Sequence, residues 1–338
     1  MRIFGLSLAF LLGISATSQA ADEKIIASAK KEGATTWYTT AIIDQLVRPM
    51  AAAFEKKYGI RVEYVRANPA EIALRVANEA KAGKMAADLV DGTTTAAALR
   101  RGDMVEKWLP DVKLPAQYVD PNGYWMAMNQ YALTPGYNTD LVPESVRPKT
   151  WDDLLDPRWA GKLAWNISAG TPSSAQGFVG LVLTELGEQK GREYLAKLRK
   201  QNIAGLNVSS RQVLDLVIAG EYAIALQIFN NHATISKARG APAGWLPMSP
   251  AHAVFSALSL VKNAPHPNAG KVLFEFIMSA EGQTIVRDSG EIPVLPELAP
   301  LEPSLRPDGT TFRAHYLTPE QIDAALPSWA NVYNEYFR

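Results

Sequence analysis

The chain has 338 residues with 34 basic and 34 acidic side chains, so its formal net charge is zero. Such a balance provides no overall field that would draw the protein to nucleic acid or to anionic lipid. The chain contains no cysteine, which excludes disulfide bonds, thiolate metal ligands and a cysteine nucleophile.

The first residues, 1–20, have the pattern of a secretory signal peptide. An arginine precedes an apolar run from Ile3 to about Ile14, and the stretch ends in Ser18-Gln19-Ala20, a small-x-small cleavage pattern. The run is shorter than the roughly 20 apolar residues that a membrane-spanning helix needs. We therefore expect cleavage near Ala20 and an exported, periplasmic protein without membrane insertion.

After the signal, the apolar pattern alternates between the periods of a helix and of a strand. Helical spacing ends at Gly33, a β-rich stretch covers 34–40, and an amphipathic helix pattern covers 41–59. Strand, helix and strand patterns then follow over 60–67, 69–84 and 86–92. This order predicts a parallel sheet in which each strand ends at a loop that opens onto a helix.

A second unit repeats this order. Residues 125–138 form one long extended pattern, and helix, turn and strand patterns follow within 150–166. Two further apolar strands are expected over 222–229 and 255–264, and one helix over 269–290. The sequence therefore predicts an α/β fold with two lobes.

The chain is expected to cross between these lobes twice, near 128–136 and near 246–254. These crossings assign 134–253 to lobe 2, and they assign to lobe 1 the two separate segments 21–133 and 254–338.

Hydroxyl side chains gather where predicted strands end. In lobe 1 they are Thr39, Thr40, Thr93 and Thr94, and in the loop before a helix of lobe 2 they are Ser168, Thr171, Ser173 and Ser174. Ligands of open α/β sheets collect beyond the carboxyl ends of the strands, and helix starts offer amides and a positive dipole end to an anion. The alternative, that these hydroxyls simply cap helices, stays open.

Ser210 and Arg211 begin another predicted helix of lobe 2. A cation at a helix N-terminus opposes the helix dipole, so Arg211 needs an anion nearby. That anion is either a carboxylate of the protein or a bound ligand, and the sequence leaves both open.

Three long segments carry a resemblance to a known family. In order, "YNTDLVPESVRPKTWDDLLDPRWAGKL", "VLDLVIAGEYAIAL" and "SLVKNAPHPNAGKVLFEFIMSAEGQ" resemble the extracellular solute-binding proteins of bacterial ABC importers, in the group that includes ferric-iron-binding proteins. The resemblance implies the type II periplasmic binding protein fold, in which two lobes joined by hinge strands close on a small solute. It also implies delivery to a membrane permease and its ATPase, with no chemistry performed on the solute.

The segment "QIFNNHA" bears on the ligand. The iron-binding members have two adjacent tyrosines where this chain has His232 and Ala233, and their histidine and glutamate ligands match Ile42 and the neighbourhood of Thr93. Fe(III) requires several anionic oxygen donors, which these residues do not provide. Asn231 and His232 are candidate ligand contacts, and a structural hydrogen-bonding role at a turn is the alternative for His232.

The sequence thus predicts a monomeric receptor for a small anionic solute such as a phosphonate, a sugar phosphate or an organic acid. We expect no enzyme, because no HExxH, GxSxG or Walker motif occurs. No cofactor and no metal ligand are assigned. The alternative is a receptor for ferric iron or a metal complex with an altered ligand set.

Overall fold

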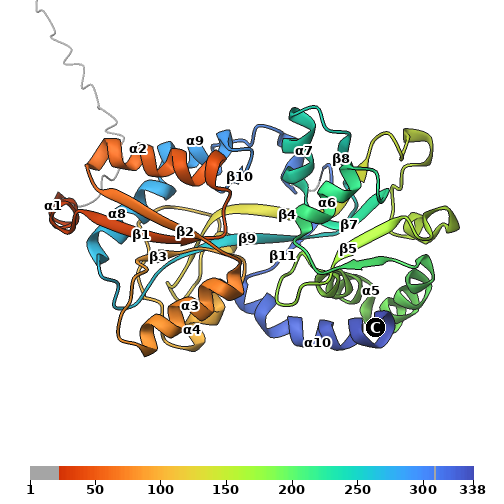
Figure 1. The fold of residues 1–338 in the computed structure, drawn as a ribbon, viewed down its shortest axis with the longest axis horizontal. Helices are drawn as coiled ribbons and strands as arrows, with labels where there is room; N and C mark the ends of the chain where they lie inside the picture. The colour runs from red at the N-terminus through yellow and green to blue at the C-terminus, as the bar shows by residue number, and fades with distance from the viewer. Residues whose placement is uncertain (1–22, 308–309) are drawn as a thin grey trace, which may run out of the picture.

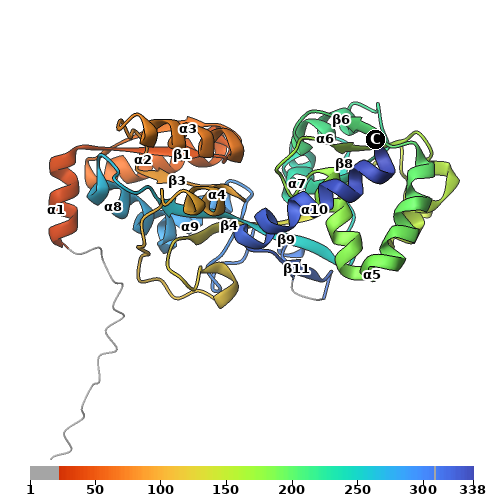
Figure 2. The same ribbon diagram turned by 90° about the horizontal axis from the view of Figure 1, so that it is seen from below.

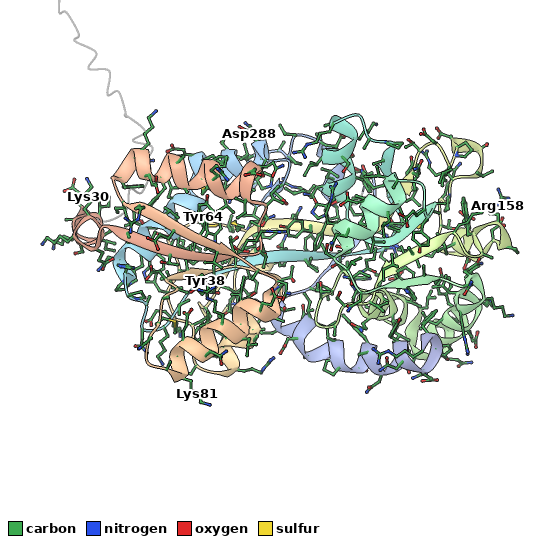
Figure 3. All side chains as sticks on the ribbon, viewed as in Figure 1. Lys30, Tyr38, Tyr64, Lys81, Arg158 and Asp288 are labelled. Atoms are coloured by element: carbon green, nitrogen blue, oxygen red, sulfur yellow. The ribbon has the colours of Figure 1, made fainter. Side chains whose placement is uncertain are left out.

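A computed structural model describes residues 23–307 and 310–338, so the expected signal peptide and its cleavage near Ala20 lie outside the described residues. The described chain forms two α/β lobes that lie side by side and are joined by long strands (Figure 1; Figure 2). Lys30 lies at the outer end of lobe 1 and Arg158 at the outer end of lobe 2 (Figure 3). Within the described ranges, no helix has both the length and the apolarity needed to cross a membrane.

Lobe 1 follows the predicted order of helices and strands. Strand β1 pairs in parallel with both β2 and β3, as the alternating pattern predicts. The elements are α1 (Glu23–Glu32), β1 (Ala34–Thr39), α2 (Arg48–Tyr58), β2 (Arg61–Arg66), α3 (Pro69–Lys81), β3 (Leu89–Val90) and α4 (Thr95–Arg101).

The helix predicted from Ala41 differs from the prediction at its start. It begins as a π-helical turn over Ile43–Val47, and the α-helix α2 starts only at Arg48. Pro49 explains the break, because it has no amide hydrogen and its ring clashes with the carbonyl four residues earlier in a continuous α-helix. The predicted end at Gly59 is confirmed, since Gly59 is the left-handed C-cap with φ of 70°.

Lobe 2 contains a second small parallel sheet in which β5 pairs with β6 and β7. The helix predicted at the start of 150–166 is instead two short 3-10 turns, Asp152–Leu155 and Pro157–Trp159. The remaining elements are β5 (Leu163–Asn166), α5 (Ala175–Leu198), β6 (Ala204–Leu206), α6 (Ser210–Ile218), β7 (Ile224–Phe229), α7 (Asn230–Ala238) and β8 (Ala243–Trp245).

Two long strands connect the lobes. Strand β4 (Met126–Asn138) pairs antiparallel with β9 (Ala251–Leu260) and also with β7 and β8 of lobe 2. Strand β9 continues into lobe 1, where it pairs with β3. The resulting sheet has the order β2-β1-β3-β9-β4-β7-β5-β6, so β4 and β9 form its centre.

The C-terminal part contributes two short strands and three helices. The single helix predicted over 269–290 is two helices, because Ser279 leaves the helical conformation and its hydroxyl accepts a hydrogen bond from the Gly282 amide at the start of the second. The elements are α8 (Pro267–Met278), α9 (Ala280–Asp288), β10 (Ile292–Pro293), which pairs with β4, β11 (Ala314–Tyr316), which pairs with β9, and α10 (Pro319–Phe337).

Helix α10 runs from the junction of the lobes along lobe 2 (Figure 2). At its start, Glu320 accepts a hydrogen bond of 3.0 Å from the Trp125 indole. At its end, Tyr333 and Phe337 pack against Trp165 in lobe 2. The sequence assigned all of 254–338 to lobe 1, whereas this helix contacts both lobes.

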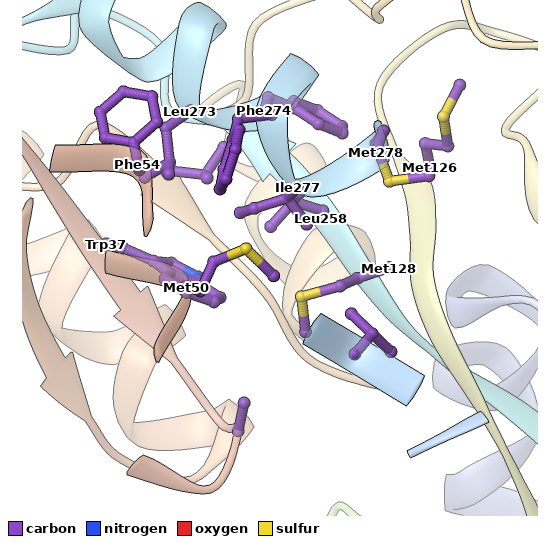
Figure 4. Close-up of a cluster of buried hydrophobic side chains, with 14 of the residues drawn as sticks. Trp37, Met50, Phe54, Met126, Met128, Leu258, Leu273, Phe274, Ile277 and Met278 are labelled. Atoms are coloured by element: carbon purple, nitrogen blue, oxygen red, sulfur yellow. The ribbon is translucent and has the colours of Figure 1, made fainter. Parts of the chain in front are cut away.

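Each lobe has a hydrophobic core of its own. In lobe 1, Trp37 of β1 and Phe54 of α2 pack with side chains of α8 such as Phe274 (Figure 4). In lobe 2, Trp165 and Phe178 occupy the corresponding position. Burying one large apolar side chain stabilises a fold by about 1.5–3 kcal/mol, so each lobe is stabilised by its own core.

Candidate functional site

Asp91 is the centre of a buried polar cluster at the strand ends of lobe 1. The Trp37 indole donates to Oδ2 at 2.8 Å, and the amide and hydroxyl of Thr40 donate to Oδ1 at 3.0 and 2.7 Å. The Ser256 hydroxyl donates to Oδ1 at 2.8 Å. These four residues, here called the Asp91 cluster, join the ends of β1 and β3 to the middle of β9, in a set of hydrogen bonds that uses both carboxylate oxygens.

The four threonines predicted in lobe 1 divide into two pairs. Thr39 accepts a bond of 3.0 Å from the Ala41 amide, and Thr40 belongs to the Asp91 cluster. Thr93 and Thr94 are also largely buried, but within the described part of the chain their hydroxyls form no hydrogen bond, and Thr94 does not cap α4 with its side chain. Thr93 and Thr94 are therefore the pair whose hydroxyls remain available to a ligand.

The predicted loop of lobe 2 is held together mainly by its own hydroxyls. Ser168 donates to Asn207 at 3.2 Å, and Thr171 and Ser173 share a bond of 3.0 Å. Ser174 donates to the Thr171 carbonyl at 2.7 Å, and it occupies the N-cap position of α5 without a side-chain bond to a helix amide. The hydroxyls of this loop shape its backbone, and the first amides of α5 are left without a side-chain cap.

Arg211 has a protein carboxylate as partner. It pairs with Asp215 one helical turn later, with Nη2 to Oδ1 at 2.7 Å, and 39% of its side chain remains exposed. Its Nη1 also donates to the carbonyl of His232 at 3.3 Å. Ser210 is buried as the first residue of α6, whereas the preceding Ser209 forms the capping box with Gln212.

His232 lies in the first turn of α7, where two arginines influence its charge. Burial, and then the positive charges of Arg211 and Arg66, lower the pKa of His232 to about 3, so its imidazole is neutral at neutral pH. Its Nδ1 is shielded from solvent and has no hydrogen-bond partner in the described chain. Arg66 ends β2 of lobe 1 and is exposed, so His232 has one guanidinium from each lobe near it.

A second polar cluster surrounds Glu291, which is 2% exposed just before β10. Its Oε2 accepts from the side-chain amides of Asn129 on β4 at 2.9 Å and of Asn231 on α7 at 3.1 Å. Burial raises the pKa of Glu291 to about 7; the two asparagines and Tyr131 lower it, and the charge of Asp91 raises it further. We call Asn129, Tyr131, Asn231 and Glu291 the Glu291 cluster.

Among the residues that the structure describes, no group of three His, Cys, Asp or Glu side chains is placed to hold a metal ion. Two hollows of about 430 and 420 Å³ also lie away from the predicted residues: the first is in lobe 2 beside Trp151 and Pro250, and the second in lobe 1 beside Lys84 and Lys262.

Comparison with known proteins gives the family. The sequence pattern of bacterial extracellular solute-binding proteins matches residues 49–309, which is more than half of the chain. The chain belongs to this family.

Two relatives of this solute-binding protein align with most of the chain. A Salmonella paratyphi A protein named for 2-aminoethylphosphonate binding in the periplasm is 26% identical over 297 residues, covering 83% of this chain and 81% of its own. An uncharacterized protein of Haemophilus influenzae is 25% identical over 298 residues, covering 83% of both chains.

Solved structures share the fold of this solute-binding protein. Iron-bound HitA of Pseudomonas aeruginosa superposes with a TM-score of 0.73 at 22% identity, covering 88% of this chain and 99% of that one. AfuA of Actinobacillus pleuropneumoniae, with fructose-6-phosphate bound, gives 0.70 at 17% identity, covering 89% and 99%. The predicted type II periplasmic binding protein fold is confirmed.

Sequence reasoning missed several polar residues of the solute-binding protein that now stand out. Arg66, Asp91, Asn129 and Glu291 were not among the predicted site residues. Asp91 and Glu291 each left a signal, because each is a single carboxylate beside a glycine at the edge of an apolar stretch. Asn129 left none, since its partner is 162 positions away in the chain.

Proposed function

We propose that this solute-binding protein captures a small anionic solute between its lobes and delivers it to the permease and ATPase of an ABC importer. The observation that carries the proposal is the pair of arginines near His232, Arg66 from lobe 1 and Arg211 from lobe 2. Guanidinium groups bind carboxylate and phosphate oxygens in a planar, two-point geometry. A solute held by both would bridge the lobes.

The proposed contacts around the anion come from both lobes. Thr93 and Thr94 contribute hydroxyls without protein partners, and the uncapped first turn of α5 contributes amides, with the loop of Ser168, Thr171, Ser173 and Ser174 holding it in place. In this proposal the protein is exported, is a monomer and performs no chemistry on the solute. In this proposal 134–253 move as lobe 2 and carry the end of α10 with them, because Tyr333 and Phe337 pack against Trp165.

A phosphonate is our first candidate among the anions. The relative from Salmonella paratyphi A is named for 2-aminoethylphosphonate, and a doubly charged phosphonate matches two guanidinium groups. Sugar phosphates and organic acids are the next candidates. Ferric iron is the remaining alternative, and His232 and its sequence neighbours Asn231 and Ala233 offer it no anionic oxygen.

The test is a binding panel on the mature protein, read by calorimetry. We expect a phosphonate to bind and Arg66→Ala and Arg211→Ala each to weaken it by about 30-fold, because closure of the lobes would bury both charge pairs and removing one member of a buried charge pair costs about 2–5 kcal/mol. Arg158→Ala, at the outer end of lobe 2, is the control and should change nothing. If Arg211→Ala lowers the melting temperature without changing affinity, Arg211 is only the partner of Asp215.

The same panel measures closure of the lobes. The chain has no cysteine, so dyes attached to a Lys30→Cys, Arg158→Cys variant report the distance between the two outer ends. We expect this distance to shorten when the anion binds. Binding of ferric iron with a visible charge-transfer band that His232→Ala removes would instead support the metal alternative.

A further inference from the structure

Glu291 is a buried carboxylate without a cationic partner. Among the ion pairs of the described residues, none includes Glu291. The groups facing it are the amides of Asn129 and Asn231 and the hydroxyl of Tyr131, and the carboxylate of Asp91 adds a further negative charge. A buried ion normally has a partner of opposite charge, and here no residue provides one.

The two asparagines beside Glu291 add further hydrogen-bond acceptors to this cluster. Asn129 and Asn231 both use their Nδ2 to donate to Glu291, which leaves both Oδ1 atoms as acceptors. Both Oδ1 atoms are shielded from solvent and have no hydrogen-bond partner in the described chain. Both side chains are fully buried. Two amide oxygens of the cluster therefore have no donor, and no described ion pair supplies a positive charge to its carboxylate.

The cluster adjoins the proposed anion contacts. Asn231 is followed directly by His232, the residue that lies near Arg66 and Arg211. The first turn of α7 therefore links two different environments. Asn231 faces the buried carboxylate of Glu291, whereas the next residue, His232, is only half-buried and lies near guanidinium groups that are partly exposed. Adjacent residues of α7 thus contact a negative and a positive protein group, since Asn231 donates to Glu291 and the His232 carbonyl accepts from Arg211.

We propose that the Glu291 cluster is a subsite for a primary ammonium group, and that the solute is a short zwitterion with an anionic group at the other end. An ammonium has three N–H donors and one positive charge. Those donors match the carboxylate of Glu291 and the free Oδ1 atoms of Asn129 and Asn231. The inference rests on the proposed function, because the arginines place the anionic end. Glu291 is then the residue that distinguishes an aminoalkyl anion from the same anion without nitrogen.

The experiment compares two ligands that differ only in the amino group, 2-aminoethylphosphonate and ethylphosphonate. Their affinities are measured for the natural mature protein, for Glu291→Gln and for the exposed control Glu63→Gln. The natural protein should prefer the amino compound by about 30-fold, which is what loss of one buried charge contact costs at minimum. Glu291→Gln should lower this preference at least tenfold, and Glu63→Gln should leave it unchanged.

A second measurement needs no variant. Because burial raises the pKa of Glu291 to about 7, the preference of the natural protein should fall by about tenfold from pH 8 to pH 6 as the carboxylate gains a proton. Because the ammonium lowers the phosphonate pKa of the amino compound, each affinity is expressed per phosphonate dianion, using the pKa of each free ligand determined by titration. This measurement decides the question if Glu291→Gln does not fold.

The outcomes separate the two proposals. If both phosphonates bind equally to the natural protein, or if the preference survives in Glu291→Gln, the ammonium subsite is wrong while the anion receptor stands. If no phosphonate, sugar phosphate or organic acid binds, the proposed function itself fails.

Discussion

The Asp91 cluster and the Glu291 cluster are neighbours, but the acceptors of the first are paired with donors and some acceptors of the second are not. They meet in the central ladder, where Ser256 of the first is paired with Asn129 of the second. Asp91 accepts four hydrogen bonds from its cluster, whereas the Glu291 cluster has two amide oxygens without donors. A buried carboxylate that is fully bonded serves the fold, and one surrounded by unpaired acceptors points to a ligand.

Isosteric amides provide the largest test of this comparison. Asp91→Asn places an NH₂ group among donors that need an acceptor, so we expect the free energy of unfolding to fall by about 2–4 kcal/mol. Glu291→Gln at pH 8 removes a buried charge without a cation, and stability should stay the same or rise. Urea denaturation of both variants measures the difference. Equal losses in the two variants would mean that both clusters are structural.

The pH dependence of stability should reveal Glu291 next. Burial raises its folded pKa to about 7 from an ordinary value of 4.5, so the folded state binds the proton more tightly than the unfolded chain does. The stability that this proton contributes is present at low pH and is lost as pH rises toward 7. Relative to Glu291→Gln, the natural protein should lose about 2–3 kcal/mol between pH 5 and pH 8.

The histidines do not disturb this measurement. His232 and His252 both have a pKa lowered to about 3 by burial, so each removes stability as pH falls below its ordinary value of 6.5. Both are present in the natural protein and in the variant, and their contributions cancel in the difference. A flat difference between pH 5 and pH 8 would show that Glu291 titrates normally.

A matched pair of threonines gives the smallest expected effect. Thr40→Val removes a hydroxyl that donates to the Asp91 carboxylate at 2.7 Å and should cost about 1.5–3 kcal/mol. Thr95 is buried nearby, but its hydroxyl has no partner in the described chain. Thr95→Val should therefore leave the melting temperature unchanged or raise it. A drop of similar size in both variants would contradict the assigned bonds.

The fold was more predictable than the site, and particular residues show why. The order of helices and strands in lobe 1 follows from local apolar periods and from stops such as Gly59. Local period alone could not separate α8 from α9, because Ser279 interrupts the helix without interrupting the apolar pattern. The hydroxyls at strand ends were visible in the sequence. Whether each one forms a hydrogen bond within the protein depends on distant partners such as Asp91, which lies 51 positions from Thr40.

Charge partners were the least predictable part. The sequence required an anion for Arg211 and left its source open, and Asp215 now supplies one at a single helical turn. The need of Glu291 for a cation could not be read from the chain, because Asn129 and Asn231 come from separate segments and meet it only in the folded protein. Unpaired donors and acceptors become visible only when distant segments are placed together.

Strand β4 also determines how this protein can be divided and recombined. Its 13 residues pair with β9 and β10 on one side of the molecule and with β7 and β8 on the other. A gene fragment encoding either lobe without this strand would expose an unpaired sheet edge, which promotes aggregation. A chimera built from two relatives therefore needs its junction inside β4. The register shift between Thr134 and Gly136 already interrupts the ladder with β7, so a junction at Pro135, which has no amide hydrogen to donate, falls where that ladder is broken.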